Sequence, residues 1–186
     1  MPKRFRLLTP TIALAVGIAL MSMSGPAFAA SAAEIDADVD EALKTLYATN
    51  AEAKMLAAKA KGVLVFPSVV KVGFVGGAQK GEGALRRGSK TVAYYSTVAG
   101  SYGLQAGIQK FAYAMFFMTA SSLRYLEASH GWEVGTGPSV VVVDSGKGQT
   151  MTTSMLQNAV YAFIFDQKGL MAGLGLQGSK ITKIQK

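Results

Sequence analysis

The sequence predicts an α+β fold that is rich in β-strand, and three observations support this class. Apolar residues early in the chain recur at helical spacing, whereas the rest carries short apolar or alternating segments with turn residues about every eight to twelve positions. Glycine is frequent, at 21 of 186 residues, and glycines inside strands mark bulges and sharp bends. Together these features predict a β-sandwich or a small closed barrel that follows an N-terminal helix.

The first 29 residues have the three parts of a secretory signal. Lys3, Arg4 and Arg6 are followed by an uncharged apolar run and then by the small residues of Ala27-Phe28-Ala29. We expect cleavage after Ala29, which makes residues 1–29 a signal peptide and residues 30–186 a single exported domain in the periplasm or cell envelope. The alternative is a retained anchor, but the apolar run is short for a bilayer span.

The chain contains no cysteine. It therefore has no acylation site of the lipoprotein type and no disulfide bond, so the domain must be stabilised by its core.

Residues 34–60 are expected to be helical. Ile35, Val39, Leu43 and Leu46 share one apolar face, and Asn50 is a plausible break that also caps a second segment. A further short helix, Ala120–Ala128, is predicted behind Thr119 as its N-cap.

The remaining chain is expected to be strand and turn. The turn Arg87-Gly88-Ser89 separates two strands, and residues 102–109 alternate like another strand. The other predicted strands are Val63–Phe66, stopped by Pro67, and the segments 69–79, 112–118, 140–143, 159–165, 170–176 and 180–184.

The charge is unevenly distributed. Residues 30–186 contain 16 basic and 11 acidic residues, a net of +5, and from residue 46 onward the net is +9. A basic body favours anionic surfaces, and export favours lipid headgroups over nucleic acid. The basic residues of predicted loops are the candidate lipid-binding residues: Arg86, Arg87, Lys90, Lys147 and Lys168.

Enzyme and metal sites lack the residues they need, so we expect no catalytic residue, metal or cofactor. The only histidine, His130, has no nucleophile motif near it, and zinc sites need several His or Cys residues. Asp36, Asp38 and Asp40 resemble the start of a calcium loop but lack its later glycine and glutamate. A G-x-G-x-x-G sequence at 173–178 precedes an alternating segment rather than a helix, so it does not indicate a dinucleotide site.

Several ordered motifs resemble the SYLF domain family. They are the segment 60–67 (AKGVLVFP), followed by segments 71–77, 81–83, 101–107, 135–138 and 168–173, and the similarity covers roughly residues 33–184. The resemblance implies a small antiparallel β-barrel core with about three helices packed outside, and binding of phosphoinositides or other phospholipids. Fungal members are also similar and bind actin filaments, whereas bacterial members are usually exported and lack an assigned reaction.

One feature departs from the family pattern. In some eukaryotic members a basic amphipathic segment ahead of the core contacts lipid, whereas the corresponding segment here carries Glu34, Asp36, Asp38, Asp40 and Glu41. We therefore expect a non-enzymatic protein that binds phospholipid headgroups weakly through its basic loops. The alternative is a structural or protein-interaction module of the bacterial envelope with an unknown partner.

Overall fold

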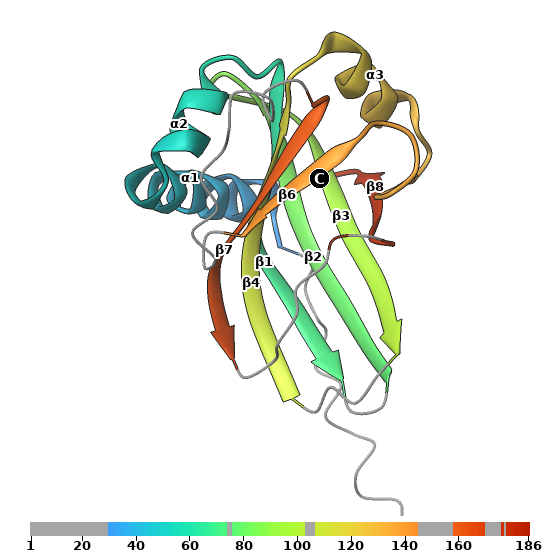
Figure 1. Ribbon diagram of the computed structural model, residues 1–186. Helices are drawn as coiled ribbons and strands as arrows, with labels where there is room; N and C mark the ends of the chain where they lie inside the picture. The colour runs from blue at the N-terminus through green and yellow to red at the C-terminus, as the bar shows by residue number, and fades with distance from the viewer. Residues whose placement is uncertain (1–29, 74–75, 103–106, 145–157, 170–175, 177) are drawn as a thin grey trace, which may run out of the picture.

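The computed structural model describes residues 30–73, 76–102, 107–144, 158–169, 176 and 178–186. Two helices, α1 (Ala32–Thr49) and α2 (Ala51–Ala57), precede the strands, and α3 (Ala120–Ala128) interrupts them (Figure 1). The strands are β1 (Gly62–Gly73), β2 (Gly76–Arg87), β3 (Lys90–Tyr102), β4 (Gly107–Phe117), β5 (Trp132–Glu133), β6 (Val140–Asp144), β7 (Val160–Gly169) and β8 (Lys180–Ile184).

The eight strands form one sheet in the order β5-β8-β3-β2-β1-β4-β7-β6, curled into half a barrel. The α+β class and the β-rich core are confirmed, with three helices packed around the sheet. Two details of the prediction are wrong. Strand β6 runs parallel to β7, so the sheet is mixed rather than antiparallel, and β5 and β6 stand at its two edges, so the described strands do not close.

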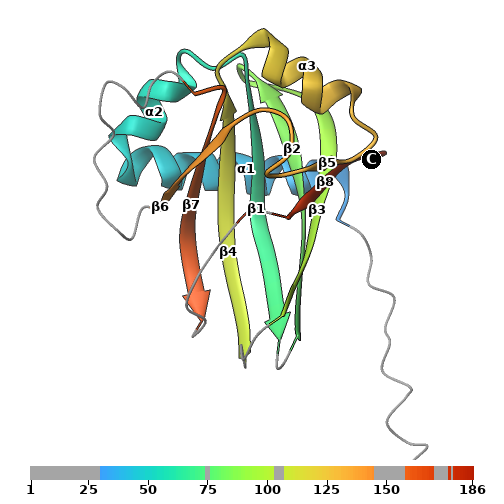
Figure 2. The same ribbon diagram turned by 45° about the vertical axis from the view of Figure 1, so that its right-hand side comes forward.

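Each face of the sheet has its own apolar layer. Helices α1 and α2 cover one face, where Val39 and Leu46 pack with Phe116 and Phe163. The other face packs against α3, and Trp132 is fully buried in that layer. Because the helices cover only one end of the long strands, the other end of the sheet extends beyond them (Figure 2).

Local sequence signals account for the three helices. Ser31 and Glu34 form a reciprocal capping box at the start of α1, and Asn50 both ends α1 and caps α2 by accepting from the Ala53 amide. Thr119 caps α3, whose bounds match the prediction. No described helix has the length and apolar character needed to cross a bilayer.

A β-bulge in β1 changes which side chains face outward. The pairing of β1 with β2 and with β4 shifts between Val65 and Val69, so β1 continues past Pro67 instead of stopping there. The bulged backbone lies close to β2, where a Cβ atom on Gly83 would stand 2.0 Å from the Val65 carbonyl oxygen. Only glycine permits this approach, which explains the glycine of that motif.

Two predicted strands instead span hairpins. The segments 69–79 and 102–109 were each expected to be extended, but β1 ends at Gly73 before β2 begins at Gly76, and β3 ends at Tyr102 before β4 begins at Gly107. The prediction at 87–89 is confirmed, since β2 and β3 are joined there, and β8 has the expected bounds. Most of the predicted strand 170–176 and all of residues 1–29 lie outside the described residues.

The two ends of the described chain meet on the surface. The Lys186 amine donates to the Ala30 carbonyl oxygen at 2.8 Å and pairs with the Glu82 carboxylate at 2.7 Å. This contact fixes the last residue of the chain beside the start of α1.

Candidate functional site

Arg86, the first of the predicted lipid-binding residues, is buried and occupied by contacts to α1. Its Nη2 lies 2.8 Å from Asp40 Oδ1 and 3.7 Å from Asp36 Oδ1, and it donates to the Asp36 carbonyl oxygen at 3.0 Å. The other guanidinium nitrogen donates to the Ser89 carbonyl oxygen. Only 8% of Arg86 is exposed, so its charge serves to hold α1 against the end of β2.

Arg87 and Lys90 are exposed at the β2–β3 turn. The Arg87 guanidinium pairs with the Glu127 carboxylate of α3, and both side chains are partly open to solvent. Arg87 also lines a pocket of about 360 Å³ together with Lys61 and Arg124. These two residues are not among the predicted lipid-binding residues. The turn therefore has a cationic pocket next to α3.

Lys168 lies at the other end of the sheet, so the structure does not bring it together with the turn residues. The seven residue steps from Lys80 to Arg87 of β2 span about 24 Å at the rise of an extended strand. Lys168 stands opposite Lys110, in the same cross-strand row as Lys80. Lys147, the fifth predicted residue, lies outside the described residues.

A row of four lysines crosses the sheet at this level. Directly opposite residues of paired strands point to the same face, so a chain of pairings defines the row. Its members, which we call the lysine row, are Lys168, Lys110, Val70, Lys80, Val98 and Lys180, in order across the sheet.

All six members of the lysine row are exposed, on the face that α1 covers further along the strands. Lys168 pairs with Asp166 at 3.1 Å, but both side chains are largely solvated, so the pair is weak. For Lys80 and Lys180, no ion pair is present within the described part of the chain.

The next row toward the end of the sheet is apolar. Val72 of β1 stands opposite Ile108 of β4 on one side and Ala78 of β2 on the other. Val72 is 50% exposed and Ile108 is 66% exposed, the largest exposed fraction among the bulky apolar side chains of the described residues. An exposed apolar end bordered by cations is typical of a surface that contacts membranes or other proteins.

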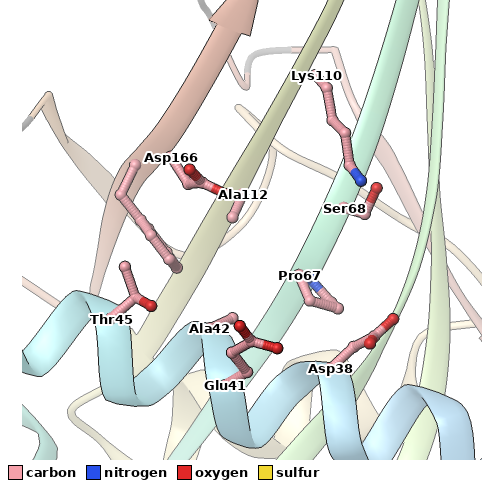
Figure 3. Close-up of a pocket in the computed structure, with 10 residues that line it drawn as sticks. Asp38, Glu41, Ala42, Thr45, Pro67, Ser68, Lys110, Ala112 and Asp166 are labelled. Carbon is pink, nitrogen blue, oxygen red and sulfur yellow. The ribbon is translucent and has the colours of Figure 1, made fainter.

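A pocket of about 190 Å³ lies between α1 and Lys110 of the lysine row (Figure 3). Asp38 and Glu41 of α1 and Asp166 of β7 line it together with Lys110 and Ser68, as the labelled side chains show. Three carboxylates against one amine make this pocket unfavourable for an anionic headgroup. They also place acidic side chains beside Lys110.

The other chemical motifs lie in ordinary structural surroundings. His130 follows α3 and is exposed, and the hydroxyl of its neighbour Ser129 donates to the Leu126 carbonyl oxygen. Asp36 is in α1 and accepts from Thr91 and Tyr94, so it is bound into the fold. The described residues contain no group of three potential metal ligands. Most of the glycine motif at 173–178 lies outside the described residues.

Sequence reasoning missed Lys80, Lys110, Lys180 and the apolar pair of Val72 and Ile108. Each lysine is isolated in the sequence, and the six row members come from six strands. The sequence does show an alternation at Val70, Lys71 and Val72. It does not show the bulge in β1, and only the bulge explains why the two valines face outward and the lysine inward.

A family model described as "Ysc84: Las17-binding protein actin regulator" matches residues 98–186, which run from the lysine-row residue Val98 to the end of the chain. No curated protein matches the chain. The matched region contains β4, α3 and the strands that follow them, and the motifs of residues 60–83 precede it. The match confirms the resemblance to the SYLF domain family over residues 98–186.

Proposed function

We propose that this protein is a non-enzymatic, exported protein that binds anionic phospholipid surfaces peripherally and weakly. The family membership is consistent with a lipid-binding or actin-regulator-like module. The observation that carries the choice of lipid is the lysine row, in which Lys80, Lys110, Lys168 and Lys180 share one exposed face.

The strength of the attachment follows from the number of cations. A lysine or arginine near an anionic lipid surface contributes about 1 kcal/mol, and this contribution falls off within a Debye length. Four lysines therefore support an attachment that is weak and sensitive to salt. Phosphoinositide or phosphatidylglycerol headgroups both supply the anionic charge that such a row attracts.

The predicted turn residues Arg87 and Lys90 are the alternative location for the lipid contact. They are exposed beside the cationic pocket formed with Lys61 and Arg124. Arg86 is omitted from this proposal because its guanidinium is buried against Asp36 and Asp40. The two ends of the sheet cannot both lie flat on one bilayer, so charge variants at each end distinguish them.

The test is co-sedimentation of residues 30–186, which contain every described helix and strand, with phosphatidylglycerol-containing and pure phosphatidylcholine vesicles. We expect binding only to the anionic vesicles, fading as salt rises to physiological ionic strength. Lys80→Gln with Lys168→Gln should weaken it about 30-fold, which corresponds to about 2 kcal/mol. The matched control, Arg87→Gln with Lys90→Gln, changes the charge equally and should leave it unaltered.

Each alternative outcome has a defined meaning. Loss of binding in the Arg87 and Lys90 variant alone would transfer the site to the turn. Binding to neither kind of vesicle would contradict the lipid function and favour a protein-interaction module of the envelope. The family description supports that second candidate, since it names a protein partner. The next measurement would then be a pull-down, in which the Lys80→Gln variant tests whether capture of the partner depends on the lysine row.

A further inference from the structure

We propose that the end of the sheet carrying Val72 and Ile108 enters the acyl-chain boundary of an anionic bilayer while the lysine row stays among the headgroups. This inference rests on the proposed function and specifies the partner further. The partner is an intact bilayer surface rather than a single headgroup in solution.

The spacing of the two rows fits the layers of a bilayer. Val72 and Ile108 are directly opposite each other, two residues further along their strands than Val70 and Lys110. Two residues of extended strand cover about 7 Å, and peripheral elements bury their apolar face about 5–10 Å into the headgroup and acyl boundary. Lysines at the level of the phosphates therefore place the two apolar side chains at that boundary.

The exposed fractions show that both side chains have apolar surface left to bury. Ile108 is 66% exposed and Val72 is 50% exposed, and Ala78 beside them is exposed as well. Completing the burial of one such side chain is worth about five-fold in affinity. This contribution is not screened by salt, unlike that of the lysines.

The acidic side chains of α1 favour this orientation over one in which α1 lies on the membrane. Asp38 and Glu41 line the pocket next to Lys110 on the same face, but on the α1 side of the lysine row (Figure 3). An anionic surface repels them, so the molecule is favoured to approach with the end of the sheet foremost, where the helices do not reach (Figure 2).

The absence of cysteine from the sequence permits a direct test with single labelled positions. Ile108→Cys carries an environment-sensitive nitrobenzoxadiazole probe, and Val92→Cys is the control. Val92 is 47% exposed in β3 but lies next to the Lys90 turn, at the other end of the sheet. With phosphatidylglycerol-containing vesicles we expect a blue shift and quenching by nitroxide-labelled lipid at position 108, and neither change at position 92.

Affinity provides an independent readout. Val72→Ser with Ile108→Ser should weaken vesicle binding about 25-fold without changing its dependence on salt, whereas Val92→Ser should have no effect. All three side chains are at least 40% exposed, so these variants should fold, which urea unfolding checks. An unchanged affinity in the double variant would overturn the insertion.

Co-sedimentation of the same labelled samples separates the two proposals. Sedimentation with an unshifted probe at position 108 would overturn insertion and leave the lipid function standing. Failure to sediment with any anionic vesicle would overturn both.

Discussion

Arg86 Nη2 lies 2.8 Å from Asp40 Oδ1, and this contact joins the end of β2 to the middle of α1. The arginine is 8% exposed, whereas the Asp40 side chain is 69% exposed, so the two partners differ in how much solvent surrounds them. Arg86, which the sequence predicts as part of a cationic loop, therefore holds α1 against the sheet.

The first prediction concerns the contact between Arg86 and α1. Arg86→Met should lower the free energy of unfolding by about 2 kcal/mol, because it leaves the carbonyl oxygens of Asp36 and Ser89 without their donor. Asp40→Asn should lower it by less than about 1 kcal/mol, because that carboxylate is largely solvated. Urea unfolding measures both values, and equal losses would contradict the assignment of Arg86 as the buried partner.

The second prediction concerns the bulge. Gly83→Ala should destabilise the protein by about 3 kcal/mol or more, because its Cβ would overlap the Val65 carbonyl oxygen of a backbone that cannot retreat. Gly100→Ala in β3 is the matched control, since a Cβ there meets nothing within 4 Å. The control should be neutral or slightly stabilising. Similar unfolding midpoints for the two variants would rule out the close approach at Gly83.

The third prediction concerns alkaline pH. Burial raises the pKa of Tyr95 to about 12, with Glu127 adding to the rise and Arg87 opposing it, and burial also raises the pKa of Tyr113. Both phenols are neutral in the folded and the unfolded chain at pH values well below 10. Between about pH 10 and 12 the unfolded chain loses these protons and the folded chain keeps them, so stability falls as pH rises.

Urea unfolding at a series of pH values above 9 checks this slope. Each retained proton costs about 1.4 kcal/mol of stability per pH unit in that window. Tyr113→Phe should make the decline shallower without changing stability below pH 9 by a comparable amount. A decline equally steep in Tyr113→Phe would mean that Tyr113 does not contribute to it.

The fourth prediction concerns Asp166, which pairs with Lys168 at 3.1 Å beside the lysine row. Asp166→Asn removes a negative charge there and should raise the affinity for anionic vesicles about five-fold at low salt. Its backbone φ of 49° is one that asparagine tolerates well, so the fold should persist. Glu127→Gln removes a charge from the other end of the sheet, and a five-fold gain in that control would contradict the location of the contact.

The features that the sequence predicted well are those with local causes. Thr119 and Asn50 cap the helices that follow them, and a cap needs only residues three positions away. Strand β8 was found from the alternation of residues 180–184, and the turn at Gly88 has the positive φ, 60°, that favours glycine.

The features that it missed depend on contacts between distant residues. Residues 102–109 alternate without interruption, so periodicity alone does not show that β3 has ended and β4 has begun. The bulge near Pro67 reverses which residues of β1 face outward, so Lys71 is buried while Val70 and Val72 are exposed. The lysine row requires the register of every intervening strand, which no local pattern contains.

The contact between Lys186 and Ala30 has a consequence for engineering the chain. Because the Lys186 side chain reaches the Ala30 carbonyl oxygen, a linker of a few residues between the two positions would turn the domain into a ring. New termini could then be opened at the exposed Gly88 turn, which is far from the lysine row. A permuted protein of this kind would carry its purification tag at the end of the sheet opposite the surface proposed to meet the membrane.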